Sequence, residues 1–218
     1  NYEMQIMTKT LAEKLYSIIE EKIVKLDFKP GTFLTESFLE KDLKCGRTPI
    51  REAIQRLSRE GLVKVLPRKG LLVTEININD QLDLIQVRRE IERLMAKLSA
   101  KNSTKAHKKK FKEISRAMRL CKNKDNTKFI KLDKEMNELL SESCDNEFVR
   151  RSIRTVGGLS RRFWFHHNKG MSDDLTIIAK LHSNVCDAIS NSNIKLAQEK
   201  SDKLMDYIEK LTRESVRL

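Results

Sequence analysis

Glycine, proline and long apolar runs are all scarce in this chain of 218 residues. It contains only 7 Gly and 3 Pro, and because these residues interrupt regular structure, their scarcity predicts a mostly helical protein. No apolar stretch approaches the roughly 20 residues that cross a membrane as a helix, and the start of the chain lacks the basic-then-apolar pattern of a secretion signal. We therefore expect a cytoplasmic protein that does not contact a membrane.

Closely spaced metal-binding or catalytic residues are also missing from the sequence. The four cysteines lie far apart, without a CxxC pair: Cys45, Cys121, Cys144 and Cys186. This spacing disfavours a zinc knuckle and predicts reduced thiols. No glycine-rich phosphate loop and no nucleophile–base combination stands out, so the sequence offers no catalytic centre of a common type.

What the chain has in excess is positive charge. Its 44 Lys and Arg outnumber its 31 Asp and Glu, which gives a net charge of +13. Such an excess favours a polyanionic partner. Charge alone does not distinguish DNA, RNA, a membrane surface and an acidic protein, so the choice depends on local patterns.

The first third of the chain has the pattern of a helix-turn-helix. Apolar side chains recur at helical spacing in three segments, which we predict to be helices: 8–26, 35–43 and 48–60. A short extended piece over 32–34 precedes the second of them. The turn over 44–46 contains glycine and joins the second helix to the third, as in a helix-turn-helix.

The third of these helices combines an apolar stripe with a basic N-terminal end. Its apolar residues recur at helical spacing: Ile50, Ala53, Ile54 and Leu57. We expect Thr48 to cap the helix and Gly61 to end it. Arg47, Arg51 and Gln55 lie off the stripe, which is the layout of a recognition helix whose first residues meet base edges in the major groove. The alternative is an ordinary surface helix with two solvated arginines.

A basic β-hairpin follows the third helix. Residues 62–66 and 71–74 are rich in strand-forming side chains and flank a tip over 67–70 that contains glycine and two basic residues. Three helices and such a hairpin predict a winged helix-turn-helix, with the wing tip along a phosphate strand or in the minor groove. We expect Arg68 and Lys69 at the tip to contact phosphates.

These segments resemble the N-terminal domain of the GntR family of bacterial transcription regulators. The similar stretches are KPGTFLTESFLEKDL, RTPIREAIQRLSREGLV and PRKGLLV, and the family's arginine–threonine–proline signature occurs as RTPIRE. The resemblance implies that Arg47, Thr48 and Arg51 contact DNA, and that Gly70 lets the wing approach the groove. Ser37 occupies a position where some relatives have arginine, so the operator sequence cannot be transferred.

The remaining residues predict an all-α antiparallel bundle. A short polar linker over 76–80 precedes it, so we expect a DNA-binding domain over 1–76 and a second domain over 77–218, for which the resemblance described next implies effector binding and dimerisation. Short connections between the helices imply antiparallel packing. Six helices are predicted: 80–101, 104–122, 126–143, 146–167, 172–190 and 193–215. The lysine run over 108–110 is interpreted as a solvated helix face, with a second nucleic-acid site as the alternative.

The bundle resembles the FCD effector domain of the FadR subfamily within the same family. The similar stretches are DLIQVRREIERLMAKLSA, FIKLDKEMNELLSESCDNEFV and LHSNVCDAISNSNIKLAQEK. In this domain family the arginine equivalent to Arg88 often faces the effector cavity, which implies an anionic effector such as an organic acid. The spacing of Arg88 and Glu92 also allows them to pair on one helix.

Members of this domain family often hold a divalent metal with an aspartate, a histidine four residues later and two further histidines. Asp133 and His182 match two of these positions, whereas Asn137 and Leu204 occupy the other two. Two strong ligands do not normally hold Zn²⁺ or Ni²⁺ tightly. The alternative is a hydrogen-bonded Asp133–His182 pair, or a metal-free effector pocket that Arg88 and these four residues line.

An arginine cluster accompanies three aromatic residues in the predicted helix over 146–167. Its members are Arg150, Arg151, Arg154, Arg161 and Arg162, beside Phe163, Trp164 and Phe165. Such a cluster could hold a carboxylate or phosphate, but packing of the aromatic rings with solvated guanidinium groups is the preferred interpretation. A buried Asp133 without a metal needs a cationic partner, for which Arg88, Arg161 and Arg162 are available.

Together these patterns and resemblances predict a homodimeric transcription regulator that binds an inverted-repeat operator and responds to a small effector, and the family resemblance favours a repressor. One winged unit contacts only a few base pairs, so two half-sites about one helical turn apart are expected. Two other hypotheses remain. The chain could be a non-sensing dimeric DNA-binding protein with a vestigial effector site, or a metal-dependent helical-bundle enzyme.

Overall fold

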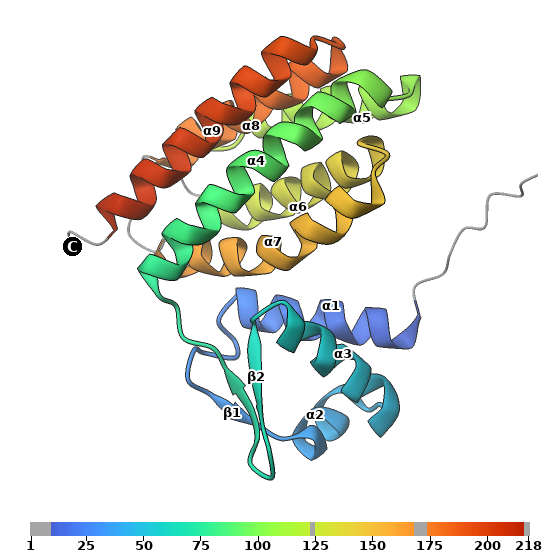
Figure 1. The fold of residues 1–218 in the computed structure, drawn as a ribbon, viewed down its shortest axis with the longest axis vertical. Helices are drawn as coiled ribbons and strands as arrows, with labels where there is room; N and C mark the ends of the chain where they lie inside the picture. The colour runs from blue at the N-terminus through green and yellow to red at the C-terminus, as the bar shows by residue number, and fades with distance from the viewer. Residues whose placement is uncertain (1–9, 123–124, 168–173, 216–218) are drawn as a thin grey trace, which may run out of the picture. The chain divides into compact units, whose positions relative to one another are not determined.

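The structure is a computed structural model that describes residues 10–122, 125–167 and 174–215. The chain divides into two compact units, Asn1–Ile76 and Asn77–Leu218. The first contains helices and a small antiparallel sheet, and the second is helical throughout its described elements (Figure 1). This confirms the predicted fold class.

Three helices of the first unit share an apolar core. They are α1 (Leu11–Val24), α2 (Glu36–Leu43) and α3 (Arg47–Arg59). The side chain of Thr35 caps α2 by accepting a hydrogen bond from the Phe38 amide at 3.1 Å. All three helices contribute buried side chains to the core: Leu15, Ile19, Ile23, Leu39, Ile50, Ile54 and Leu57. The predicted apolar stripe of the third helix is therefore its buried side.

The start of α3 differs from the sequence prediction. Its first helical residue is Arg47, and Gly46 occupies the N-cap position without a side-chain capping bond. The prediction that Thr48 caps this helix is therefore wrong, because Thr48 already lies inside the first turn. Its exposed side chain is not committed to capping. Gly61, with φ of +75°, follows the helix end as predicted.

The sheet of the first unit has one strand more than the predicted hairpin. β2 (Val63–Leu66) and β3 (Gly70–Val73) pair antiparallel as expected. The short strand β1 (Phe33–Leu34) pairs with the other edge of β3, so the strand order is β1-β3-β2. The extended piece before α2 thus supports the base of the wing.

Gly70 is required by this sheet. Its φ is +103°, a conformation that side-chain-bearing residues rarely adopt. A Cβ at this position would also lie 2.5 Å from the carbonyl oxygen of Leu34 in β1. Only glycine lets β1 approach this closely. The implied role of Gly70 at a DNA groove stays a prediction.

A buried polar cluster joins α1 to the end of α3. The Tyr16 hydroxyl donates to Glu60 Oε2, and Arg56 Nε donates to Glu60 Oε1 at 3.1 Å. The Arg56 guanidinium also lies 3.7 Å from the centre of the Tyr16 ring. Burial, followed by the charge of Glu20, raises the pKa of Tyr16. The cluster fixes the end of α3 against α1.

The second unit contains six helices within its described residues. They are α4 (Ile78–Asn102), α5 (Lys105–Arg119), α6 (Asn126–Ser143), α7 (Glu147–His167), α8 (Asp174–Ser190) and α9 (Ile194–Glu214). α4 begins inside the predicted linker, because Asn77 Oδ1 accepts from the Asn79 amide at 2.8 Å and caps the helix. The prediction of a linker was therefore wrong from Ile78 onward. The first residues of the predicted helices over 8–26 and 172–190 lie outside the described residues.

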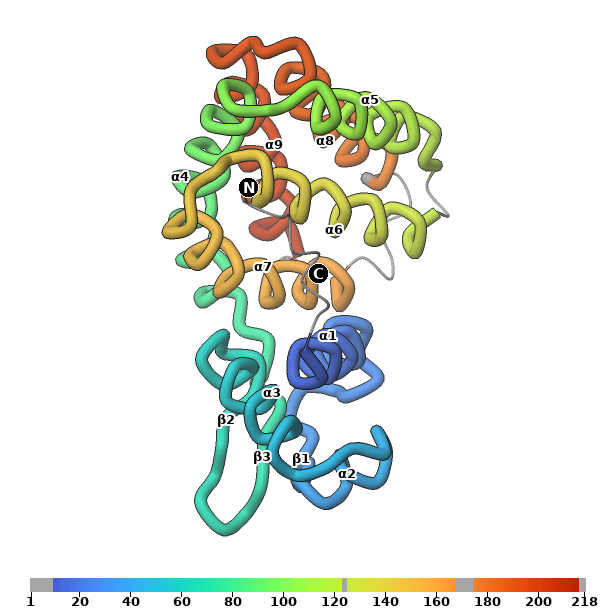
Figure 2. Tube along the Cα trace, turned by 90° about the vertical axis from the view of Figure 1, so that its right-hand side faces the viewer, coloured from blue at the N-terminus to red at the C-terminus, as the bar shows by residue number. Residues whose placement is uncertain are grey.

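These helices pack as a bundle around a second apolar core. α4 and α9 lie side by side and run antiparallel (Figure 1), and α5 packs against α8 and beside α6 (Figure 2). Buried residues from all six helices meet in the core: Met95, Phe111, Met118, Phe129, Met136, Leu140, Ile153, Val185 and Leu204. In the part of the chain that the structure describes, no helix is long and apolar enough to span a membrane.

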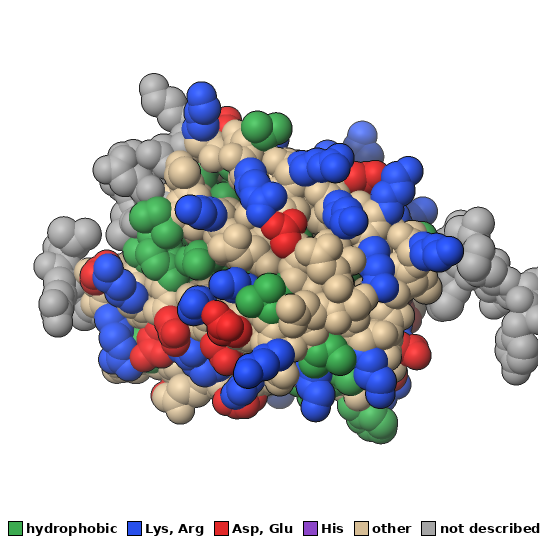
Figure 3. Space-filling model, turned by 90° about the horizontal axis from the view of Figure 1, so that it is seen from above, with side chains coloured by type: hydrophobic (Ala, Val, Ile, Leu, Met, Phe, Trp, Pro, Cys, Tyr) green, Lys and Arg blue, Asp and Glu red, His purple; other side chains and the backbone are tan. Residues whose placement is uncertain are grey.

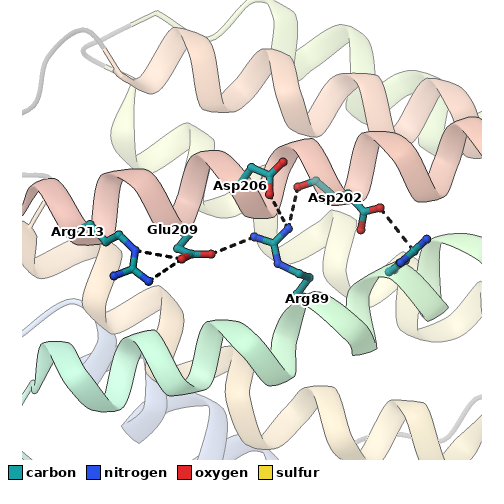
Figure 4. A network of polar contacts seen from close by, with 6 residues as sticks. Arg89, Asp202, Asp206, Glu209 and Arg213 are labelled. Atoms are coloured by element: carbon teal, nitrogen blue, oxygen red, sulfur yellow. Dashed lines mark hydrogen bonds and ion pairs between the residues drawn. The ribbon is translucent and has the colours of Figure 1, made fainter.

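A row of surface ion pairs connects α4 to α9 (Figure 4). Arg89 of α4 lies 2.6 Å from Asp206 Oδ1 and 3.1 Å from Glu209 Oε2. Arg213 donates to Glu209 at 2.8 Å. The hydrogen bond from Arg213 lowers the pKa of Glu209, and the bond from Arg89 adds to this effect against the opposing effect of burial. Each exposed pair contributes at most about 1 kcal/mol, so the row fixes the register of the two helices more than their stability.

Candidate nucleic-acid interface and effector site

One face of α3 presents the residues that the sequence predicts to meet base edges. Arg47, Arg51 and Gln55 are spaced four apart, so they lie along one side of the helix, and all three side chains are exposed. Thr48 is exposed in the same first turn. The structure therefore brings these four predicted residues together on the surface of the first unit.

Glu36, which the sequence analysis missed, joins two of them. Its Oε2 accepts a hydrogen bond from Arg51 Nε at 2.9 Å and from Arg47 Nε at 3.3 Å. Burial raises the pKa of the Glu36 carboxyl, but the hydrogen bonds from Arg51 and Arg47 outweigh burial and hold the pKa below its ordinary value of 4.5. In the sequence Glu36 looks like an ordinary acidic residue in the first turn of a helix.

Both arginines use Nε for this contact. The terminal guanidinium nitrogens of Arg47 and Arg51 make no hydrogen bond to another described residue. A guanidinium carries five N–H donors in a planar fork, so each arginine keeps its terminal donors available. Glu36 therefore orients the two side chains without occupying the nitrogens that a guanine or phosphate would meet.

The wing tip is a tight turn with exposed basic side chains. The Lys69 amide donates to the Leu66 carbonyl at 3.0 Å, Pro67 follows Leu66, and Arg68 has φ of +64°. This combination is the pattern of a type II turn, which favours glycine at the position of Arg68. The left-handed conformation costs an arginine roughly 1–2 kcal/mol, yet this position holds an exposed basic residue.

In the interior of the bundle, Asp133 of α6 pairs with His182 of α8. His182 Nε2 lies 3.2 Å from Asp133 Oδ1, and the two side chains are 7% and 17% exposed respectively. Burial raises the pKa of Asp133. The hydrogen bond and charge of His182, with the charges of Arg161 and Arg88, outweigh burial and hold the pKa below its ordinary value of 3.8. This hydrogen-bonded pair is the arrangement that the sequence analysis gave as the alternative to a metal site.

The residues around this pair do not fit a tightly held metal ion. His182 Nδ1 lies 2.8 Å from the Ile178 carbonyl oxygen, which leaves one ring nitrogen for Asp133. Asn137 directs its amide nitrogen, a donor, to Asp133 Oδ1 at 3.1 Å, and Leu204 is buried without a ligating atom. Within the described ranges, no three side chains from His, Cys, Asp and Glu gather as metal ligands do.

Arg88 pairs within its own helix, as its spacing from Glu92 allows. Its Nε donates to Glu92 Oε1 at 2.8 Å, and the two side chains are only 13% and 10% exposed. In the arginine cluster of α7, Arg151 donates to Glu147 at 3.0 Å. Arg162, by contrast, is buried. The structure therefore separates this cluster into surface and interior members.

Two further polar groups of α7 were missed by the sequence analysis. Ser160 Oγ and Trp164 Nε1 are buried and have no hydrogen-bond partner among the described residues. Their spacing of four places them on one side of α7. The Trp164 ring lies 6.0 Å from that of Phe129, which lies 5.3 Å from His182. Phe129 thus connects the Trp164 ring to His182 of the Asp133–His182 pair, a link that no sequence pattern indicated.

Comparison with known proteins connects both units to described families. The model of bacterial regulatory proteins of the gntR family matches residues 11–73, and the FCD domain model matches residues 83–207. The second match covers more than half of the chain. Both resemblances stated from the sequence are confirmed.

Individual relatives agree with these matches. The chain is 26% identical to the uncharacterized HTH-type transcriptional regulator YdhC of Bacillus subtilis, over 67% of this chain and 66% of that protein. It is 25% identical to the HTH-type transcriptional repressor RspR of Escherichia coli, over 68% of this chain and 66% of that protein. The matches thus span just under two thirds of these curated relatives.

Solved structures agree with the fold. E. coli McbR/YncC superposes with a TM-score of 0.79 at 15% identity, over 96% of this chain and all of that one. A GntR regulator from Rhodococcus sp. RHA1 gives 0.66 at 17% identity, over 94% of this chain and 97% of that one. Because the matched families are regulators, the hypothesis of a helical-bundle enzyme is excluded.

The chain belongs to the GntR family of bacterial regulatory proteins, in the group whose DNA-binding domain is followed by an FCD domain.

Proposed function

We propose that the chain is a cytoplasmic, homodimeric transcription repressor that an organic acid controls through the FCD bundle. The observation that carries the DNA-binding part is the pair of exposed arginines that Glu36 orients on α3. The names of two relatives, the E. coli repressors RspR and GlaR, support repression over activation.

The geometry of α3 favours direct contact with bases. An arginine that presents two nitrogens can bind O6 and N7 of guanine at once, and such a contact contributes roughly 1–3 kcal/mol of discrimination. Arg47 and Arg51 each keep their terminal nitrogens available beyond Glu36. Gln55, one turn further along, can contact adenine in the same groove.

The wing and Thr48 are proposed to contact phosphates. Arg68 lies at a turn position where glycine would relieve backbone strain, and strained positions are often found at functional sites. Lys69 extends from the same exposed tip. Contacts of this kind fix the position of the protein on the duplex without selecting sequence.

Selection from a pool of randomised duplexes tests this part. We expect enrichment of an inverted repeat with half-sites about 10 base pairs apart, because each winged unit contacts one half-site. On the selected site, Arg51→Ala should weaken specific binding by roughly 1–3 kcal/mol and leave nonspecific binding nearly unchanged. Lys69→Ala should weaken both equally and reduce the salt slope by about one. No enrichment, or an equal loss of both kinds of binding for Arg51→Ala, would refute the assignment.

The interior of the bundle supports an anionic effector. Ser160 Oγ and Trp164 Nε1 are donors without a described partner, and a buried donor left unpaired costs about 1–3 kcal/mol. A ligand carboxylate offers acceptors for both. The positive charges of Arg161 and Arg88 also reach the interior of the bundle, because both lower the pKa of Asp133.

A thermal-shift screen of small organic acids, paired with their amides, tests the effector. At about 100 times its Kd, a ligand stabilises the folded state by about 2.7 kcal/mol, which raises the melting temperature of a protein of this size by roughly 5–10 °C. Acids that stabilise the protein should also release it from the selected duplex, and Trp164→Phe should weaken both effects. If no acid produces either effect, the non-sensing alternative holds.

A further inference from the structure

Most of the excess positive charge lies outside the unit that matches the DNA-binding family. Residues 1–76 contain 14 Lys and Arg against 11 Asp and Glu, whereas residues 77–218 contain 30 against 20. Within the second unit, residues 97–134 alone contain 14 Lys and Arg against 3 Asp and Glu. Their net charge is +11, compared with +13 for the whole chain. This segment runs from the end of α4 through α5 into α6.

Six basic residues of α5 share one side of the helix, which we call the α5 basic face. They are Lys105, Lys108, Lys109, Lys112, Arg116 and Arg119. With about 100° between successive residues, these positions fall within an arc of roughly 100° that extends for about 21 Å along the helix. Glu113, the acidic residue of α5, lies outside this arc. Figure 3 shows a face of the molecule on which Lys and Arg side chains are more widely spread than Asp and Glu side chains.

The α5 basic face lies opposite a side of the helix that packs in the core, and most of its members form no ion pair with a described residue. Phe111 and Met118, on another side of α5, are fully buried in the core. Arg119 forms an ion pair with α8, whereas the other five members pair with no described residue. On α9, by contrast, Lys203 and Lys210 pair with glutamates four positions away. Like charges three and four residues apart repel, and the first turn of α5 has no acidic residue to match the helix dipole.

We propose that the α5 basic face binds the phosphate backbone of double-stranded DNA, in addition to the contacts of α3 and the wing. The proposal rests on the proposed DNA binding of the first unit. That unit brings duplex DNA to a high local concentration, which favours DNA over other polyanions. Insertion into a membrane would need a free apolar side, and the apolar side of α5 is buried in the bundle. Contacts to phosphates alone make this site independent of sequence.

Two full-length variants with the same change in charge test the proposal. The face variant replaces four exposed residues of α5: Lys105→Gln, Lys109→Gln, Lys112→Gln and Arg116→Gln. The control variant replaces four lysines of α9: Lys195→Gln, Lys200→Gln, Lys203→Gln and Lys210→Gln. Glutamine keeps a good helix propensity, and the melting temperature of the face variant should stay the same or rise because like charges are removed. Binding to a random-sequence duplex of about 40 base pairs is measured by fluorescence anisotropy over a range of salt concentrations.

The face variant is expected to lower the slope of log affinity against log salt by about three, and the control variant by less than one. If the face variant and the wild type bind equally at 1 M salt, this difference in slope makes the binding of the face variant about a thousandfold weaker at 0.1 M salt. An equal change in both variants would show a general effect of net charge, and no change in either would show a solvated face. Loss of binding to phosphatidylserine vesicles with unchanged duplex binding would assign the face to a membrane. Each of these three results overturns the proposal. If the wild-type protein binds no duplex at all, the proposed function itself fails.

Discussion

Replacing Glu36 by glutamine tests whether this residue supports the arginines that we propose to contact DNA, or competes with DNA for them. Glu36 Oε2 accepts from Arg51 Nε at 2.9 Å and from Arg47 Nε at 3.3 Å. Glutamine keeps the shape of the side chain and removes its charge. Two consequences oppose each other. The variant replaces the charge-assisted contact that orients both arginines by a weaker neutral one, and it also loses a negative charge that repels phosphates.

The geometry decides which consequence dominates at a specific site. Ordering a long side chain on binding costs about 0.5–1.5 kcal/mol, and Glu36 provides part of that ordering for two arginines before DNA arrives. Since the arginine side chains remain 65% and 52% exposed, we take the lower part of this range for each. The total of about 1–1.5 kcal/mol corresponds to roughly tenfold weaker specific binding. Nonspecific binding depends on charge alone and should become slightly stronger.

The assay compares specific and random duplexes at several salt concentrations, with Glu40→Gln as the matched control. Glu40 lies on the same helix and forms no ion pair with a described residue, so its replacement changes the charge without affecting Arg47 or Arg51. We expect Glu36→Gln to lower the ratio of specific to nonspecific affinity about tenfold or more, and Glu40→Gln to leave that ratio unchanged. If specific and nonspecific binding both become tighter in Glu36→Gln, the carboxylate competes with DNA and the reasoning is refuted.

Three other substitutions test separate parts of the structure. Tyr16→Phe removes a buried hydrogen bond to a carboxylate and should lower the free energy of unfolding by about 1.5–3 kcal/mol. The raised pKa of Tyr16 favours the protonated hydroxyl in the folded state. Above pH 10.0, the ordinary pKa of tyrosine, the free energy of unfolding of the wild type should therefore fall by up to about 1.4 kcal/mol per pH unit. Denaturation of Tyr16→Phe over the same pH range should lack this contribution. Gly70→Ala should cost at least about 2 kcal/mol in thermal unfolding, because it adds strain and a clash with β1. Asn137→His combined with Leu204→His should make the melting temperature rise with added Zn²⁺, and an unresponsive double variant would show that position 204 does not face Asp133 and His182.

Helix α3 and the hairpin could be predicted because their signals are local. The apolar stripe of α3 repeats within four turns, and the strands of the wing are adjacent in the sequence. Periodicity reports burial directly, so it located the exposed positions Arg47, Arg51 and Gln55 on one side of α3. It could not locate the helix start, because Gly46 provides the N-cap position without a side-chain signal.

The parts that the sequence did not predict depend on residues far apart in the chain. Leu34 pairs with Leu71, and this pairing explains Gly70 in a way that the hairpin alone does not. The contact of Glu36 with α3 likewise requires the angle between two helices. In the bundle, the Asp133–His182 pair joins α6 to α8, and the buried donors of Ser160 and Trp164 lie on a third helix, α7.

The ion-pair partners of the basic side chains distinguish charges that are used within the fold from charges that remain available to a ligand. Arg89 forms its ion pairs with residues of a neighbouring helix, and Lys203 pairs with a glutamate on its own helix, so their charges are used within the fold. The arginines of α3 pair only partly, through Nε to Glu36, and keep their terminal nitrogens available. The α5 basic face goes further, since five of its members pair with no described residue. Repulsion within that face weakens the isolated protein, and a polyanion that neutralises the face removes this repulsion, so binding and stabilisation are expected to increase together.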